Sequence, residues 1–230
     1  MISLVLAEAE LERVPQQILS HPSIRIQAKQ KGKPASHLIL DASFHHSAMK
    51  TLPEGKRRGR PDITHIFLLC ALESIANKDK MIKTIVIHTR NNEAIWVHPE
   101  TRIMKNYTRF IGLMEQLFEK HIIKAGELTL MKLQKDNTLE NIVKELDAEI
   151  VMICSDTGRK TDINDYFTKL QEGQVDHLAC IIGGFPSGTF NSEINKLSDD
   201  VVCLYPEKLT AWTTVNEILT WYYHVFKNRK

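Results

Sequence analysis

IIGGFPSG at residues 181–188 follows the apolar run at 177–182, and this junction between a buried strand and a glycine-rich loop decides the fold class. Short apolar runs alternate with segments of helical spacing around it. We expect strands at 128–131, 149–154, 177–182 and 201–204, and helices at 138–146, 162–170, near Asn191 and from Thr210 onward. This alternation predicts an α/β fold whose parallel sheet is covered by helices on both faces.

The glycine spacing of this loop is similar to two cofactor motifs and satisfies neither. A P-loop needs Lys and then Ser or Thr after its last glycine, whereas Thr189 and Phe190 follow Gly188. A dinucleotide fingerprint needs its glycines after the first strand, and this loop comes late in the chain. Two interpretations remain: a close approach of the backbone to a ligand or another segment, or a tight turn without a ligand.

Two further loops belong with this one. Residues 154–158 follow the preceding strand, and residues 204–210 follow the next one. Because ligands bind beyond the carboxyl ends of the strands in open α/β sheets, we expect the three loops to surround one small molecule. Main-chain groups would hold a base, with Leu204, Tyr205 and Leu209 as apolar walls.

The first half of the chain mixes strand and helix patterns. We expect strands at 2–6, 37–40, 83–88 and 94–97, the last two as a hairpin turned at Asn91 and Asn92. We expect a helix after the acidic residues Glu8, Glu10 and Glu12, which His21 and Pro22 would break. Further helices are expected between Asp41 and Lys50, at 63–76 and through 110–118. No repeat, low-complexity tract or long linker marks a domain boundary.

Two basic clusters precede helices. RRGRPD at 57–62 places three arginines, a fixed turn and a carboxylate on a loop, and a polyanion is the natural partner for such a loop. The alternative is a solvated loop in which Asp62 caps the next helix. The second cluster, at 99–109, puts Lys105 and Arg109 one turn apart on the polar face of its helix, where they can address the same ligand.

Composition limits the classes of function. The chain has 30 Lys and Arg against 28 Asp and Glu, so any affinity for nucleic acid must come from a local patch. Four cysteines in apolar runs, with no CxxC pair, indicate reduced thiols in a cytoplasmic protein. Among ten histidines only His45 and His46 are close in sequence, so we expect no metal site. No signal peptide or membrane-spanning run is expected.

Three blocks together resemble a known family: RRGRPD at 57–62, PETRIMKNYTRFIGLMEQLF at 99–118 and IIGGFPSG at 181–188. They resemble, in order and spacing, the pseudouridine N1-specific ribosomal RNA methyltransferases of the SPOUT class, which act in small-subunit biogenesis. The resemblance covers essentially the whole chain and is closest to archaeal members. It implies a SPOUT-type α/β knot with a C-terminal trefoil, as a single domain over 1–230 with family-specific insertions in the N-terminal half. It also implies a homodimer, S-adenosylmethionine as methyl donor, and small-subunit ribosomal RNA as substrate.

The resemblance assigns residues by position. Those expected to bind the cofactor are Gly183, Gly184, Gly188, Leu204, Tyr205, Leu209 and Thr210, with Ser155 and Thr157 in a less similar loop. Those expected to bind RNA are Arg57, Arg58, Arg60, Arg102, Lys105 and Arg109. The family often has Pro and Arg where Met104 and Lys105 stand, so Lys105 keeps the charge but loses the bidentate fork of arginine.

Asp62 and Arg60 are the expected catalytic residues. The N1 atom of pseudouridine carries a proton and is a poor nucleophile until that proton is shared or removed. Asp62 is placed to accept it or to orient the base through it, the alternative being a helix cap. A competing interpretation is an RNA-binding assembly factor in which methyl transfer is secondary, but such a factor could dispense with the glycine loop and Asp62. A small-molecule methyltransferase would not need two basic clusters.

The final helix carries a wide apolar stripe through Ala211, Val215, Ile218, Tyr222 and Val225. Such a stripe can cover the core of its own chain and a partner subunit together. Packing against its own domain alone is the alternative.

Overall fold

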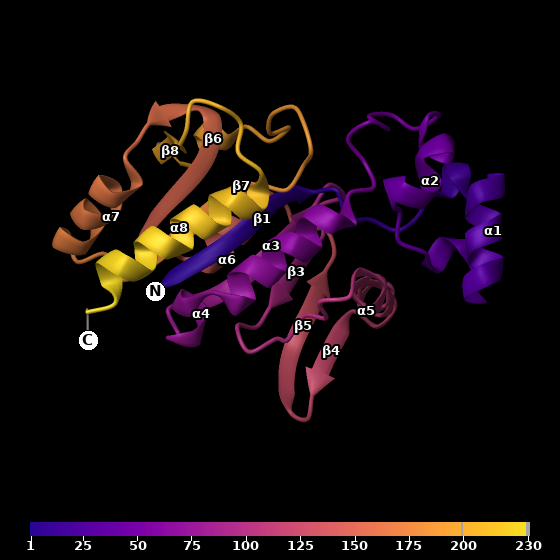
Figure 1. Cartoon of the computed structure of the whole chain (residues 1–230), viewed down its shortest axis with the longest axis horizontal. Helices are drawn as coiled ribbons and strands as arrows, with labels where there is room; N and C mark the ends of the chain where they lie inside the picture. The colour runs from indigo at the N-terminus through magenta and orange to yellow at the C-terminus, as the bar shows by residue number, and fades with distance from the viewer. Residues whose placement is uncertain (199, 229–230) are drawn as a thin grey trace.

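An eight-stranded sheet runs through the computed structural model of the chain, which describes residues 1–198 and 200–228 (Figure 1). The strands are β1 (Ile2–Ala9), β2 (Ile82–Thr89), β3 (Ala94–Val97), β4 (Ile122–Ala125), β5 (Leu128–Gln134), β6 (Ile150–Lys160), β7 (Leu178–Gly183) and β8 (Asp200–Cys203). Their order in the sheet is β4-β5-β3-β2-β1-β7-β6-β8. Strands β2, β1, β7, β6 and β8 are mutually parallel, and β3, β5 and β4 extend the sheet in antiparallel pairs.

Helices cover both faces of this sheet. They are α1 (Pro22–Lys31), α2 (Ala42–Met49), α3 (Pro61–Glu73), α4 (Ile75–Lys78), α5 (Tyr107–Lys120), α6 (Leu139–Leu146), α7 (Ile163–Glu172) and α8 (Ala211–Phe226), with short 3₁₀ turns at Gln16–Ile18, Ala35–His37 and Ile194–Lys196. Along the central strand, Leu4 and Leu6 pack in the core beneath α3, α7 and α8, and Val5 and Ala7 pack beneath α6. This alternation follows from the two-residue period of a strand. The predicted α/β fold with two covered faces is confirmed.

Several predicted elements differ from the structure. The strand expected at 128–131 was predicted to begin the parallel run, but the structure has it as β5, which pairs antiparallel with β3 and β4. Residues 37–40 form no strand and share only an isolated bridge between Arg13 and Ile39. His21 and Pro22 begin α1 rather than break a helix, because Pro22 occupies a first-turn position and the His21 side chain accepts the Ser23 N–H. Near Asn191 there is only the 3₁₀ turn.

The carboxyl half of β6 bends over β8. Met152 to Cys154 pair with residues 200–202, and the same strand returns at Arg159 and Lys160 to pair with Val202 and Cys203. Gly158 lies at the crossing, where a Cβ atom would come within 2.6 Å of the Val202 carbonyl carbon. Only glycine allows the two backbones to pass this closely.

Helix α8 packs mainly on its own chain. Its buried side chains are Ala211, Thr214, Val215, Ile218, Leu219, Tyr222 and Phe226, and it lies against α3, α4 and α7 (Figure 1). The packing alternative therefore accounts for most of the predicted stripe, and the homodimer stays a prediction. No helix in the described part of the chain combines the length and the apolar character needed to cross a membrane.

Candidate active site and cofactor cavity

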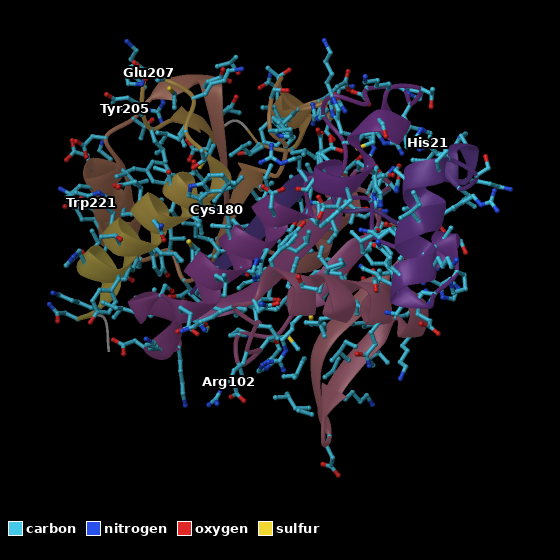
Figure 2. All side chains as sticks on the ribbon, turned by 45° about the vertical axis from the view of Figure 1, so that its right-hand side comes forward. His21, Arg102, Cys180, Tyr205, Glu207 and Trp221 are labelled. Carbon is cyan, nitrogen blue, oxygen red and sulfur yellow. The ribbon has the colours of Figure 1, made fainter. Side chains whose placement is uncertain are left out.

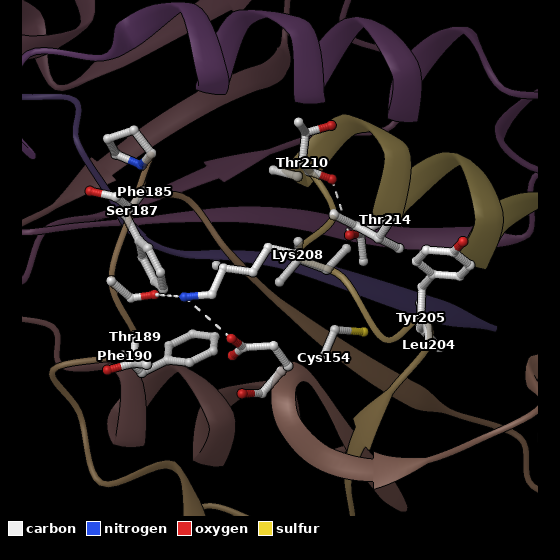
Figure 3. Close-up of a pocket in the computed structure, with 18 of the residues that line it drawn as sticks. Cys154, Phe185, Ser187, Thr189, Phe190, Leu204, Tyr205, Lys208, Thr210 and Thr214 are labelled. Atoms are coloured by element: carbon white, nitrogen blue, oxygen red, sulfur yellow. Dashed lines mark hydrogen bonds and ion pairs between the residues drawn. The ribbon is translucent and has the colours of Figure 1, made fainter.

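A cavity of about 390 Å³ lies at the carboxyl ends of β6, β7 and β8 (Figure 3). Its walls come from residues 154–156, 182–183, 185–190, 202–205, 207–212 and 214, with Arg60 and Ile63 from the start of α3. The three segments expected to surround one ligand therefore meet, although residues 154–158 lie inside β6 and do not form a loop after it as expected. Of the predicted cofactor residues, those that line the cavity are Ser155, Gly183, Gly188, Leu204, Tyr205, Leu209 and Thr210.

Two predicted cofactor residues lie outside the wall. Gly184 is buried against β1, where its N–H donates to the Ala7 carbonyl at 2.7 Å and an added Cβ would lie 2.8 Å from Ala9 Cα. The residue must be glycine to let the loop pack on the strand. The Thr157 hydroxyl lies 2.9 Å from that of Ser155, so Thr157 supports a lining residue without itself forming the wall.

An ion pair spans the cavity. Lys208 Nζ lies 3.2 Å from an Asp156 carboxylate oxygen and 3.2 Å from the Gly188 carbonyl oxygen, and so it joins all three loops (Figure 3). Both residues stand in the predicted loops, but sequence reasoning assigned neither a role. Their opposite charges after successive strands were the available signal.

Arg57 makes its polar contacts inside the protein, so the structure gives no support to its expected role in RNA binding. Its Nε donates to Glu10 at 2.9 Å, one Nη donates to Glu8 at 2.8 Å, and the other donates to the Thr189 carbonyl at 2.8 Å. Its guanidinium also lies 4.0 Å from the centre of the Phe185 ring. The side chain is only 10% exposed, so its donors are already satisfied inside the protein.

Arg58 is committed in the same way. It makes a two-pronged pair with Glu12, at 2.7 and 2.6 Å, and its side chain is 11% exposed. Arg90 bridges the two acidic positions, with Nη1 2.7 Å from Glu10 and Nε 3.9 Å from Glu12. Burial raises the pKa of the Glu10 carboxyl, although Arg90 and Arg57 oppose that shift. The structure therefore gives no support to the expected role of Arg58 in RNA binding either.

Arg60 and Asp62 form a partly exposed ion pair at the end of the basic loop. Arg60 donates to both Asp62 oxygens, at 2.8 and 2.7 Å, and the two side chains are 33% and 38% exposed. The hydrogen bond to Asp62 raises the pKa of Arg60. Arg60 stands at the N-cap position of α3 without a side-chain cap bond, and Pro61 begins the helix. Asp62 therefore faces a guanidinium at the cavity instead of capping the helix with its side chain.

The first turn of α5 lies close to this pair. The Tyr107 hydroxyl donates to the buried Asp41 carboxylate at 2.6 Å. The charges of Tyr107 and Asp41 add to the rise in the pKa of Arg60. Burial and the bond to Asp41 raise the pKa of Tyr107 well above its ordinary value. Arg109 belongs to the same first turn, which Asn106 caps through the Arg109 N–H.

The second basic cluster is exposed. Arg102, Lys105 and Arg109 all lie on the surface, and none forms an ion pair with another residue in the described part of the chain. Figure 2 places Arg102 far from Tyr205 and Glu207, which line the cavity, so Arg102 lies away from the cofactor cavity. Within the described ranges, no group of three or more His, Cys, Asp or Glu side chains has an arrangement that could hold a metal ion.

Comparison with known proteins decides the family. Residues 4–222 match the family described as EMG1/NEP1 methyltransferase. The chain belongs to this family. The family resemblance inferred from the sequence motifs is thereby confirmed.

Relatives of the EMG1/NEP1 family match at full length. The chain is 46% identical, over 96% of its length and 95% of the relative's, to the ribosomal RNA small subunit methyltransferase Nep1 of Methanothrix thermoacetophila. It is 43% identical to the protein of the same name from Pyrococcus furiosus, over 96% of both chains. The crystal structure of Archaeoglobus fulgidus Nep1 bound to S-adenosylhomocysteine superimposes with a TM-score of 0.86 and 36% identity, covering 98% of this chain and 99% of that one.

Proposed function

We propose that the chain is a methyltransferase that uses S-adenosylmethionine to methylate N1 of a pseudouridine in small-subunit ribosomal RNA. The names of its relatives and the S-adenosylhomocysteine in the Archaeoglobus structure support the reaction and the cofactor. The observation that carries the proposal is the placement of Arg60. It lines the cavity and holds Asp62 beside it, so one residue joins the cofactor cavity to a carboxylate.

The cavity residues fit S-adenosylmethionine. Leu204 and Leu209 offer apolar walls for an adenine, and Ser155 and Thr210 offer hydroxyls. Asp156 supplies a carboxylate suited to an ammonium or sulfonium group once Lys208 releases it. When bound, the cofactor supplies an electrophilic methyl group on sulfur.

Asp62 is placed to accept the N1 proton of the target base. Arg60 occupies one lone pair on each of its oxygens, and a carboxylate oxygen has a second lone pair that remains available. Asp62 would orient the base through the N1–H and take the proton as the N1–methyl bond forms, while Arg60 keeps the carboxylate in place. Such proton transfer contributes about a hundredfold or more to a rate, and positioning contributes further.

The exposed cluster would hold the RNA backbone. Lys105 lies just before the Asn106 cap of α5 and not on the helix as expected, whereas Arg109 is in the first turn of α5. Both cationic groups are exposed and suit phosphates on either side of a base turned out of a stem-loop. Arg102 would bind a more distant phosphate.

A homodimer, a knotted C-terminal region and a cytoplasmic location belong to the same proposal. The exposed aromatic residues Tyr205 and Trp221, at 55% and 37%, lie on the same side of the molecule and support a partner surface there (Figure 2).

The return of β6 over β8 supports a chain that passes through its own loop. A single domain over 1–230 is consistent with one continuous sheet. Light scattering at micromolar concentration tests the dimer, and a monomer would contradict it.

The test of the function is methyl transfer from labelled S-adenosylmethionine to a short small-subunit RNA hairpin. Two hairpins are compared that differ only in having uridine or pseudouridine at one loop position. We expect label on the pseudouridine hairpin alone, because only that base has a free N1. Tight RNA binding without label on either hairpin would instead favour an assembly factor.

Asp62→Asn tests the role of the carboxylate. The amide keeps the shape but cannot take a proton, so methyl transfer under saturating RNA and cofactor should fall about a hundredfold or more. An unchanged rate would exclude Asp62 as the base.

A further inference from the structure

Arg57, the buried arginine of the basic loop, contacts the loop that follows β7 and lines the cavity, here called the cofactor loop (residues 184–192). Arg57 donates to the carbonyl of Thr189 and lies over the ring of Phe185, and both of these residues line the cavity. Arg57 itself does not line it. Its contacts therefore reach the cavity only through the outer side of the loop.

Glu8 holds the same loop from a second direction. Its two carboxylate oxygens accept the N–H groups of Asn191 and Ser192, at 2.8 and 2.7 Å, and one of them also accepts from Arg57 at 2.8 Å. Glu8 adopts a left-handed backbone conformation, with φ of 53°. This conformation is costly for a residue other than glycine and persists only where the surroundings enforce it.

The RNA side of the site depends on the same strand end. The Arg60 N–H donates to the Glu10 carbonyl at 2.9 Å, and the Glu10 carboxylate binds Arg57. Arg60 is three positions after Arg57. The end of β1 thus fixes both the segment that carries the catalytic pair and the segment that forms the cofactor cavity.

We propose that Arg57 and Glu8, here called the clamp, are positioning residues that keep the cofactor loop in register with Arg60 and Asp62. This inference rests on the proposed function and deepens it. The clamp has no direct contact with phosphate, so its loss should affect cofactor binding and the rate of transfer but not the grip on RNA.

Arg58 provides a matched control. It is the next residue, it is as buried as Arg57, and it makes an equally complete pair with a glutamate. Its partner is Glu12, and no contact joins it to the described cofactor loop. A lysine at either position keeps the charge and loses the two-pronged geometry.

The experiment measures S-adenosylhomocysteine binding by calorimetry for Arg57→Lys, Glu8→Gln and Arg58→Lys, below the unfolding midpoint of each variant. We expect both clamp variants to bind about tenfold or more weakly, because each loses a charge-assisted hydrogen bond to the loop, while Arg58→Lys binds as the wild type does. Glu8→Gln carries the test alone if Arg57→Lys does not fold.

A second measurement separates positioning from RNA contact. In methyl transfer, both clamp variants should lower kcat and leave the KM for RNA within about twofold, with an unchanged dependence of RNA binding on salt. Wild-type affinity for S-adenosylhomocysteine in both clamp variants would overturn the inference, and so would a weaker salt dependence in Arg57→Lys. A wild-type protein that binds S-adenosylhomocysteine but methylates neither hairpin would contradict the proposed function, while the calorimetric comparison would still decide the clamp.

Discussion

The two basic clusters look alike in the sequence and differ in the structure. The loop at 57–60 has the densest run of cations, yet Arg57 and Arg58 are buried in ion pairs. The cluster at 102–109 is sparser, and Arg102, Lys105 and Arg109 are all exposed. Density of charge along a chain therefore does not identify the surface that meets a polyanion.

The difference arises from the end of β1. Glu8, Glu10 and Glu12 are buried and balance three arginines, one for one, from two other segments: Arg57, Arg58 and Arg90. A buried charge is tolerated only when it is paired and hydrogen-bonded. The arginines at 57 and 58 are thus part of the architecture, and Arg60 alone in the loop is left for substrate.

The largest expected effect is a difference in stability loss between a substitution in the loop at 57–60 and one in the cluster at 102–109. Arg57→Ala removes the cation paired with the buried Glu8 and leaves Glu10 with Arg90 alone, so it should lower the free energy of unfolding by about 3–5 kcal/mol. Arg109→Ala removes an exposed cation and should change it by about 0.5 kcal/mol or less. Chemical denaturation of both variants measures the difference, and equal losses would show that the burial of Arg57 does not matter.

A pH effect of intermediate size should come from His45, another buried polar group. Burial lowers the pKa of His45 from 6.5 to about 4, and the Asp41 charge opposes that shift. The His45 Nδ1 accepts the Asp41 N–H, and its Nε2 bonds Gln27. A group whose pKa is lower in the folded state contributes stability that is complete above pH 6.5 and is lost as pH falls toward 4. Allowing for solvent screening, we expect a loss of about 2 kcal/mol.

His45→Gln is the matched variant, because its amide can accept from Asp41 and donate to Gln27 without titrating. Unfolding free energies of both proteins are measured between pH 7 and 4. The variant should show a shallower decline, and parallel curves would remove His45 as the cause.

The smallest expected effect is a change in RNA affinity from a substitution in the exposed cluster at 102–109. Lys105→Arg restores a planar fork that can hold a phosphate with two hydrogen bonds. RNA affinity should rise about twofold to threefold with the same dependence on salt, since the charge is unchanged. Filter binding or fluorescence anisotropy detects this, and a weaker complex would place Lys105 away from the backbone of the RNA.

Much of the fold was predictable because it depends on local pattern. The hairpin strand at 94–97 and the helix at 138–146 agree with β3 and α6 within a residue, since alternation and helical spacing show directly in the residues. The three cavity loops were predicted from their positions after strands, because the carboxyl ends of parallel strands share one edge.

The features that the sequence pattern did not reveal depend on contacts between residues far apart in the chain. Glu8 and Glu10 were expected in a loop between the first strand and a helix, and the structure shows them buried against arginines 47 to 80 positions away. Nothing in a residue's neighbours along the chain reveals such pairs. For the same reason the antiparallel position of β5, and the commitment of Arg57 to the cofactor loop, became visible only in the structure.

The most direct test of this division of labour is the salt dependence of binding to the pseudouridine hairpin. Arg109→Gln and Arg58→Gln are compared with the wild type across a range of salt concentration. Each phosphate contact contributes about 0.7–0.9 to the slope of log affinity against log salt, so Arg109→Gln should reduce the slope by about that amount and Arg58→Gln should not change it. A reduced slope for Arg58→Gln, or an unchanged one for Arg109→Gln, would contradict the account.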